Sequence, residues 1–297
     1  MYKTIKNNIV HSRCPLCKAK NIYALGKSPY PENLYYSTER IEVEHSPELW
    51  KCRRCSSGFI QNIIPENTSI SLYSEGSSAD RWINHLKFSE AKSEATTVLF
   101  SKILIENKTV LDIGCNSGEF LDYAKDKGCK TFGLEYSQTS LKVLNTKGHI
   151  AHDKWESFGA EQKFDVITAF DLIEHLYDVP EFMKQCAERL NPGGYFIFLS
   201  GDISSFSAVL AQSLWWYTRF PEHIVFPSKK YIKKFTSFDI ELWIPTYHSK
   251  AAEAYSVSCK KNKISFFKNL LSSLVKKEYS GMPTLSPDHA LVVLRHA

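Results

Sequence analysis

The feature that most constrains the fold is the stretch from Val110 to Gly118, which reads VLDIGCNSG. Its first four residues are typical of a buried strand, and two glycines follow before a segment with helical character. Gly114 and Gly118 lack a Cβ, so the backbone can adopt unusual dihedral angles and approach a ligand closely. The first amides of the following helix would face the same ligand. The stretch therefore predicts a strand, a ligand-binding turn and a helix.

Strands and helices then alternate to about residue 202, as a parallel sheet covered by helices requires. We expect strands over 109–113, 130–134, 149–152, 164–170 and 195–199, with helices over 118–127 and about 180–190. Two later strands are expected over 238–244 and 290–294. The sequence therefore predicts an α/β domain over residues 109–297.

Four of the eight cysteines form two C-x-x-C pairs, Cys14/Cys17 and Cys52/Cys55, with 34 residues between the pairs. This spacing lets four thiolates converge tetrahedrally on one Zn²⁺. The N-terminal segment is too short to build a sufficient core alone, so a metal crosslink would stabilise it. Sulfur would fill all four positions, which makes the zinc structural; a redox dithiol and unliganded core cysteines are the alternatives. We expect a zinc-binding domain over 1–65 and a helical connector over 66–108.

Charge is distributed unevenly along the chain. The net charge of +5 combines −2 over residues 1–202 with +7 over 203–297. Residues 260–277 contain six lysines, no acidic residue and apolar residues at helical spacing. This basic insertion, about 260–283, would contact anionic lipids or an acidic substrate, or would pack on its own domain with solvated lysines. No run of 18 apolar residues and no signal-peptide core is present, which favours a cytoplasmic protein, at the inner membrane face if the lipid contact forms.

Three segments, VLDIGCNSGEF, FDVITAFDLIEHL and LNPGGYFIFLS, together with Glu135 at a strand end, resemble class I S-adenosylmethionine-dependent methyltransferases. The segments follow one another in the order of that family. The resemblance implies a Rossmann-like, seven-stranded, mostly parallel sheet with helices on both faces, closed by an antiparallel pair of strands. A nicotinamide dehydrogenase is disfavoured, because the turn lacks the G-x-G-x-x-G spacing.

The same resemblance implies which residues bind the cofactor S-adenosylmethionine. Those around its methionine part would be Asp112, Gly114, Cys115, Asn116 and Gly118. Glu135 would hold the ribose, Asp153 and Trp155 would contact the adenine, and Phe170 and Asp171 would border the sulfonium.

Methyl transfer to a hydroxyl requires a base placed near the acceptor. His175, just past the strand over 164–170, is the first candidate, and Glu174 would orient it. His223 is the second, in a PEH-aliphatic-aromatic stretch that resembles an acceptor-closing segment of many methyltransferases of this group. The alternative for both histidines is a packing or capping role. Residues 206–220, with Trp215 to Tyr217, would form a lid within about 203–235, or would pack into the core.

The zinc segment before such a domain resembles bacterial enzymes that methylate sugars. O-methylation of a sugar hydroxyl, in a nucleotide-sugar or a surface polysaccharide, is therefore the leading hypothesis. Deoxysugar C-methylation is disfavoured, because those enzymes usually carry a further C-terminal domain. An RNA methyltransferase would explain the lysines, but no RNA-binding module accompanies them, so a nucleic-acid partner is disfavoured. A non-catalytic cofactor-binding scaffold is the other alternative. The sequence specifies neither the acceptor atom nor the oligomeric state.

Overall fold

The computed structural model describes residues 3–28, 34–36, 39–74, 103, 106–218, 222–246 and 286–296 of the 297-residue chain. The expected basic segment over 260–277 lies outside these residues, as do residues 75–102, 104 and 105 of the expected connector over 66–108. Among the described residues, no helix has the length and apolar content that crossing a bilayer would require.

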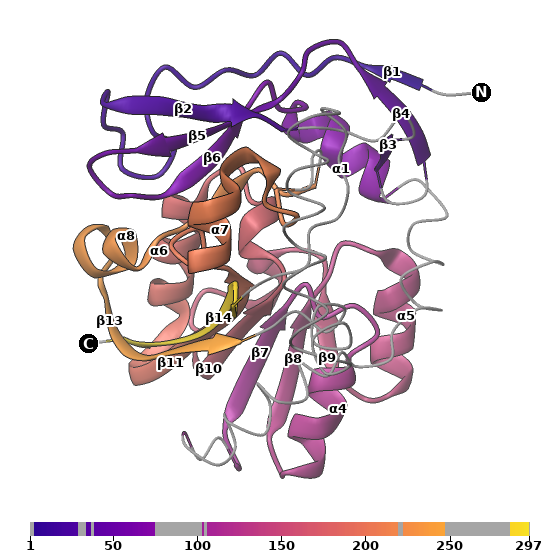
Figure 1. Ribbon diagram of the computed structural model, residues 1–297. Coiled ribbons are helices and arrows are strands. Elements are labelled where there is room, and N and C mark those ends of the chain that lie inside the picture. Colours follow the sequence, from indigo (N-terminus) through magenta and orange to yellow (C-terminus); the bar gives the residue numbers. More distant parts are fainter. Residues whose placement is uncertain are drawn as a thin grey trace, which may run out of the picture.

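The central sheet has seven strands in the order β13-β14-β11-β10-β7-β8-β9 (Figure 1). Their bounds are β7 Thr109–Ile113, β8 Lys130–Leu134, β9 Ile150–His152, β10 Phe164–Phe170, β11 Leu190–Gly201, β13 Phe238–Thr246 and β14 His289–His296. The strands β9, β8, β7, β10 and β11 are parallel, whereas β14 runs antiparallel to both β11 and β13. The expected Rossmann-like, mostly parallel sheet is confirmed.

Helices cover both faces of this sheet because its strands are apolar on both sides. Val110 packs in one core with α4 (Glu119–Asp126) and α5 (Gln138–Thr146). Its neighbour Leu111 packs in a second core with α6 (Val179–Arg189) and α8 (Lys229–Phe235). The alternation of side chains along a strand thus distributes the helices between the two faces.

The N-terminal segment forms two small sheets, which lie above the central sheet in Figure 1. One has the order β1-β4-β3, with β1 Lys3–Ile5, β4 Glu39–Val43 and β3 Leu34–Tyr36. The other has the order β12-β6-β5-β2, with β12 Val225–Phe226, β6 Gly58–Gln61, β5 Glu48–Cys52 and β2 Ile22–Lys27. The helix α1 (Glu66–Ser74) follows β6. Because β12 comes from the C-terminal half of the chain, the expected N-terminal and methyltransferase domains share a sheet.

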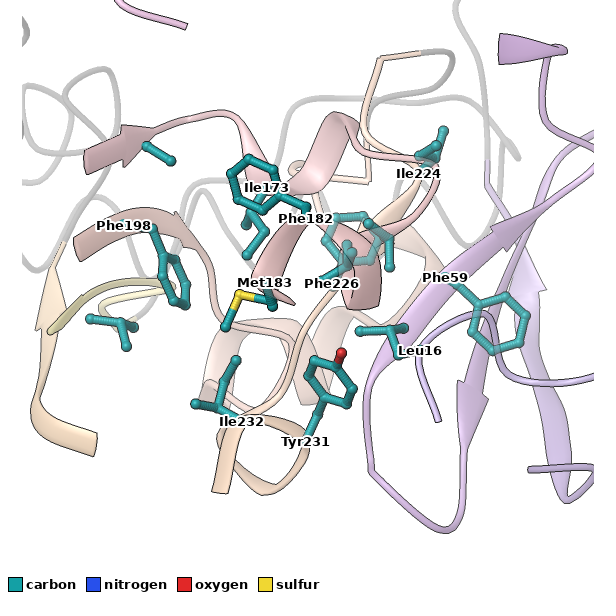
Figure 2. Close-up of a cluster of buried hydrophobic side chains, with 14 of the residues drawn as sticks. Leu16, Phe59, Ile173, Phe182, Met183, Phe198, Ile224, Phe226, Tyr231 and Ile232 are labelled. Atoms are coloured by element: carbon teal, nitrogen blue, oxygen red, sulfur yellow. The ribbon is translucent and has the colours of Figure 1, made fainter. Parts of the chain in front are cut away.

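One continuous hydrophobic cluster joins the N-terminal segment to the central sheet. Leu16 and Phe59 from the N-terminal segment belong to the same cluster as Phe226, Tyr231 and Met183 (Figure 2). All five side chains are buried. The four-cysteine segment is therefore packed against the larger domain.

Several local expectations need correction. The strand expected over 195–199 is longer, because β11 extends from Leu190 to Gly201. Helix α1 lies within the expected helical connector over 66–108, whereas helix α5 was not predicted from the sequence. Residues 206–214 form a short helix, α7 (Phe206–Ala211), and a 3-10 turn, η3 (Gln212–Leu214). Trp215 and Tyr217, which follow, are only 1% and 2% exposed, so both side chains pack into the core.

Candidate functional site

The turn after β7 contains several left-handed backbone conformations. Gly114 has a φ of 69°, Asn116 of 50° and Gly118 of 84°. A Cβ on Gly118 would lie 2.6 Å from Cδ2 of Leu144. Both backbone angle and packing therefore favour glycine at this position. The turn presents its backbone at the carboxyl edge of the sheet, where open α/β sheets bind their ligands.

Glu135 follows β8 directly and connects two turns of the site. Its buried carboxylate accepts hydrogen bonds from the backbone N–H groups of Asn116 and Ser137, each 2.9 Å long. Burial raises the pKa of Glu135, and the hydrogen bonds from these amides oppose that shift. Each carboxylate oxygen keeps a further lone pair for a ligand hydroxyl. This arrangement is compatible with the predicted ribose role, which stays a prediction.

Asp112 and Cys115 are both buried beside the glycine turn. The Thr168 hydroxyl donates a 2.6 Å hydrogen bond to the carboxylate of Asp112. The Cys115 sulfur lies so close to Gly133 that a Cβ there would be 2.7 Å away. Burial raises the pKa of the Cys115 thiol well above its ordinary value, so the thiol stays protonated. These contacts fix the turn, and a ligand contact by either side chain stays a prediction.

The remaining predicted cofactor residues follow β9 and β10. Asp153 comes directly after β9, and Trp155 begins a 3-10 turn, η1 (Trp155–Phe158), which packs on the core. Phe170 ends β10 and packs edge-on against Phe120 with ring centroids 5.1 Å apart. Asp171 then has a φ of 50°. Because β9, β8, β7 and β10 are neighbours in the sheet, all these turns open at one edge.

The three predicted catalytic residues come together beyond β10. Glu174 and His175 lie in a 3-10 turn, η2 (Ile173–His175), whereas His223 directly precedes Ile224 and β12. The Nε2 atoms of His175 and His223 each lie 4.0 Å from the same oxygen of Glu174, Oε1. The two imidazole rings are 4.8 Å apart between centroids. The structure therefore unites residues that are about fifty positions apart in the sequence.

The two histidines differ in exposure and hydrogen bonding. The side chain of His175 is 34% exposed, compared with 11% for His223 and none for Glu174. Nδ1 of His223 lies 2.6 Å from the backbone oxygen of Tyr217. A carbonyl oxygen only accepts hydrogen bonds, so Nδ1 carries the proton and Nε2 is left as the basic nitrogen in the neutral ring. His175 is thus the more accessible base, and His223 is the more fixed one.

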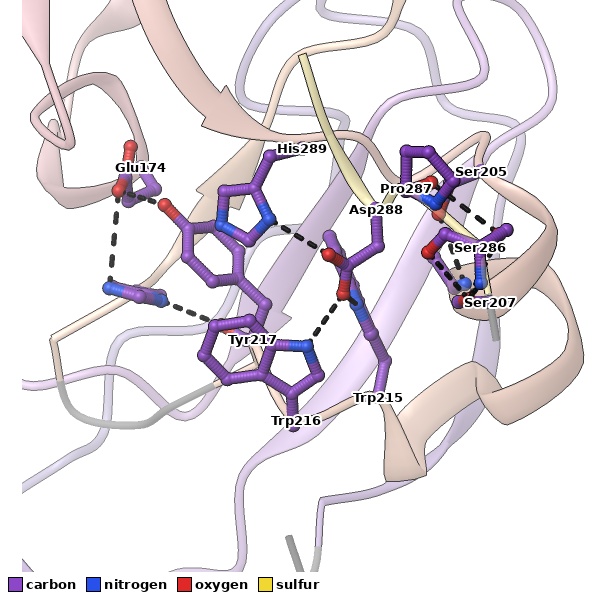
Figure 3. A network of polar contacts seen from close by, with 12 residues as sticks. Glu174, Ser205, Ser207, Trp215, Trp216, Tyr217, Ser286, Pro287, Asp288 and His289 are labelled. Carbon is purple, nitrogen blue, oxygen red and sulfur yellow. Dashed lines mark hydrogen bonds and ion pairs between the residues drawn. The ribbon is translucent and has the colours of Figure 1, made fainter. Parts of the chain in front are cut away.

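Sequence reasoning missed the groups that support Glu174. The Tyr217 hydroxyl donates to Oε1 of Glu174 (Figure 3). The Ser200 hydroxyl donates to Oε2 of the same carboxylate over 2.8 Å. Behind Tyr217, Asp288 accepts hydrogen bonds from the indole N–H groups of Trp215 and Trp216. The adjacent aromatic residues Trp215 to Tyr217 were a sequence signal, but their partners are distant in the chain. Trp216 is half-buried, and the lid role of the stretch over 206–220 stays a prediction.

Burial and neighbouring charge act in opposite directions on Glu174. Complete desolvation raises the pKa of its carboxyl, while the positive charge that His175 can carry lowers it. Burial also raises the pKa of the Tyr217 hydroxyl well above its ordinary value, so this group remains a donor. At 4.0 Å, neither imidazole is directly hydrogen-bonded to the carboxylate. The nearest ligand atoms of the three residues lie within 4.8 Å of one another, a spacing that would also suit a metal ion.

A second cluster lies in the N-terminal segment, where the four predicted cysteines come together. Cys14 and Cys55 have their sulfurs 3.7 Å apart, and Cys17 and Cys52 have theirs 3.5 Å apart. All four sulfurs lie within 4.8 Å of one another. Zinc–sulfur bonds of about 2.3 Å in a tetrahedron place sulfurs about 3.8 Å apart. The number, chemistry and spacing of these thiols fit a tetrahedral metal site.

Comparisons with known proteins agree with this geometry. A family model described as a methyltransferase domain matches residues 85–237, slightly more than half of the chain. A ubiquinone biosynthesis O-methyltransferase from Bradyrhizobium diazoefficiens is 33% identical over 95 residues, which cover 30% of this chain and 38% of that protein. One from Leptothrix cholodnii is 28% identical over 106 residues, covering 32% and 45% respectively. The chain thus matches less than half the length of these relatives.

The fold also resembles solved structures. A methyltransferase structure from Galdieria sulphuraria superposes with a TM-score of 0.50 and 15% sequence identity. The match covers 70% of this chain and 87% of that one. At this level of identity the likeness concerns the fold alone.

Proposed function

The chain belongs to the family of methyltransferase domains, and we propose that it transfers a methyl group from S-adenosylmethionine to a hydroxyl oxygen of a small aromatic molecule. The observation that carries this proposal is the cluster of Glu174, His175 and His223. It lies just beyond β10, the strand next to β7 and its glycine turn. A base is therefore available beside the edge where the cofactor would bind.

The expectation of a sugar acceptor is wrong. The curated relatives are named ubiquinone biosynthesis O-methyltransferases, which points to a small molecule of a quinone pathway instead. The sugar interpretation depended on the four-cysteine segment. That segment packs against the larger domain and pairs its strand β6 with β12, so its presence is explained by structural contacts.

The proposed cofactor site consists of the residues at the carboxyl edge of β7 to β10. Gly114 and Gly118 would let the backbone approach the ligand, and Glu135 would accept hydrogen bonds from the ribose hydroxyls. The other proposed contacts are Asp112, Cys115, Asn116, Asp153, Trp155, Phe170 and Asp171. S-adenosylmethionine supplies a methyl group on a positively charged sulfur, and the protein's task is to orient the acceptor oxygen in line with it.

His175 is the proposed general base. As the acceptor oxygen forms its bond to the methyl carbon, the carbon–sulfur bond breaks and the hydroxyl proton passes to the imidazole. The nearby Glu174 carboxylate stabilises the imidazolium that results. A phenolic hydroxyl gives up its proton to an imidazole base more readily than a less acidic aliphatic hydroxyl does. His223 would hold the acceptor or share the proton.

For the four-cysteine cluster we propose a structural Zn²⁺ bound by Cys14, Cys17, Cys52 and Cys55. The spacing of the sulfurs supports this assignment, since it suits tetrahedral coordination. Four thiolate ligands leave no open position, so the ion would stabilise the fold and take no part in methyl transfer.

The test of the acceptor class uses labelled S-adenosylmethionine and two matched sets of candidate acceptors, mono- and dihydroxybenzenes and aliphatic diols. We expect label in aryl methyl ethers and none in the aliphatic set. Label confined to the aliphatic set would contradict the proposed acceptor.

A further inference from the structure

The four-cysteine unit is connected to the catalytic cluster through the backbone. The strand β12 lies next to β6, with Val225 opposite Phe59 and Phe226 opposite Gly58. The N–H of Ile60 also donates to the backbone oxygen of Ile224, 2.9 Å away. The chain that leaves His223 therefore forms β12, the edge strand of this sheet. Its neighbour β6 pairs on the other side with β5, which ends at Cys52.

The opposite side of this segment contacts the catalytic turn. The N–H of Ile224 donates a 2.8 Å hydrogen bond to the backbone oxygen of Glu174. Ile224 thus bonds to the cysteine unit through its carbonyl and to η2 through its amide. Because His223 directly precedes it, these two bonds determine where the imidazole lies relative to the Glu174 carboxylate.

Two buried serines strengthen the connection. The hydroxyl of Ser228 donates to the backbone oxygen of Cys55, and its N–H donates to the hydroxyl of Ser57 over 3.0 Å. Both serines are at most 1% exposed. Ser228 is also the N-cap of α8, where its hydroxyl accepts from the N–H of Tyr231. The serine pair therefore links a cysteine of the proposed metal site to the segment that follows β12.

We propose that the four-cysteine unit positions the acceptor side of the active site, and that Ser57 and Ser228 are the positioning residues that transmit its order to His223. The effect of this connection on catalysis rests on the proposed function. Its effect on the position of the His223 ring does not depend on that function. The glycine turn and Glu135 belong to β7 and β8, so cofactor binding should depend little on this connection.

The primary test reads the His223 ring directly by NMR of protein labelled with ¹⁵N-histidine, with the resonance assigned through His223→Gln. In the wild type we expect a protected Nδ1–H signal, because Tyr217 accepts that hydrogen bond. In Ser57→Ala/Ser228→Ala this signal should broaden or be lost. Ser205→Ala is the matched control: Ser205 likewise caps a helix, accepting from the N–H of Ala208, but bonds to no cysteine among the described residues. An unchanged His223 signal in a folded double variant would overturn the proposal.

A second readout measures catalysis and binding in the same variants. The double variant should lose roughly 10- to 100-fold in kcat/KM for the phenolic acceptor, since small misplacements of catalytic groups have effects of that size. Its affinity for S-adenosylhomocysteine should stay within about twofold of the wild type. The single variant Ser57→Ala, which retains the cap of α8, keeps the test usable if the double variant fails to fold. Equal losses in kcat/KM and in cofactor affinity would contradict a positioning role.

The two proposals fail separately. If the chain transfers no methyl group to phenols but the His223 signal still responds to the serine substitutions, the proposed acceptor is wrong and the positioning inference stands. If the chain methylates phenols but the His223 signal does not respond to the serine substitutions, the proposed acceptor stands and the positioning inference is wrong.

Discussion

His223 donates its Nδ1 hydrogen to the backbone oxygen of Tyr217, 2.6 Å away, and this fixes which ring nitrogen is basic. Nε2 then faces Oε1 of Glu174 at 4.0 Å, and the hydroxyl of Tyr217 donates to that same oxygen. One tyrosine therefore orients both a histidine and the buried carboxylate beside it.

Replacement of Tyr217 by phenylalanine tests this arrangement. The loss of the hydroxyl leaves Oε1 of buried Glu174 without one donor, which should lower stability by about 1 to 2 kcal/mol and kcat by about tenfold. Tyr177→Phe is a matched control, because the Tyr177 hydroxyl also donates a hydrogen bond, to the backbone oxygen of Ile64, and lies 2.9 Å from the Ser69 hydroxyl, outside the cluster. The control should lose similar stability, measured by urea unfolding, and keep its kcat. Equal kcat values for the two variants would count against the assignment.

The pH dependence of stability reports on Glu174. Burial raises the pKa of its carboxyl above the ordinary 4.5, so the folded protein binds more protons than the unfolded chain above that pH. This contribution to stability is complete below about pH 4.5 and is lost as the pH rises through the folded-state pKa. The loss is about 1.4 kcal/mol for each pH unit that separates the folded and unfolded pKa values. Glu174→Gln removes the titration. We expect unfolding free energies of the variant to fall less than those of the wild type between pH 5 and 8, and parallel curves would refute the shift.

The glycine turn can be tested with a pair of glycines. Gly118→Ala combines a φ of 84° with a Cβ 2.6 Å from Leu144, and it should lower S-adenosylhomocysteine affinity by more than about tenfold. Gly159 has a φ of 74°, but a Cβ added there would meet no atom of the described residues within 4 Å. Gly159→Ala should therefore cost about 1 to 2 kcal/mol of stability and leave affinity unchanged in calorimetry. Weak binding by both variants would mean that strain alone explains the loss.

Metal content tests the cysteine cluster. The wild type should contain one zinc per chain, and Cys14→Ser should contain none. Structural zinc contributes on the order of 10 kcal/mol, so this variant should expose its N-terminal segment to proteolysis. Cys129 is also buried but lies outside the cluster, and Cys129→Ser should retain the metal. A wild-type protein without zinc, purified under reducing conditions and without chelators, would contradict the proposed site.

Much of the fold could be predicted from the sequence, because strands and glycine turns are determined by residues that are adjacent in the chain. The strand and turn over 110–118 are one example. The two C-x-x-C pairs are another, since their spacing predicted that the four cysteines come together. Helix α5 was missed, since its sequence QTSLKVLNT has few apolar residues, although Ser137 caps it. The two-residue strand β12 was also missed, because its partner β6 lies far away in the sequence.

The support of Glu174 could not be predicted for a related reason. Ser200 is 26 residues away and Tyr217 is 43 residues away, and each reaches the carboxylate only through tertiary packing. A glutamate followed by a histidine suggests an acid–base site. The burial of Glu174, however, depends on how the chain folds back at residues 217 and 223. The prediction of a sugar acceptor is wrong because it depends on the cysteine segment, whose contacts with the larger domain are structural.

The most direct test of the central claim compares wild type with His175→Ala in methyl transfer to a phenolic acceptor, alongside S-adenosylhomocysteine binding. We predict that the wild type forms the aryl methyl ether, and that the variant loses at least about 100-fold in kcat while it binds the cofactor product equally well. Transfer by the variant at the wild-type rate would contradict His175 as the base.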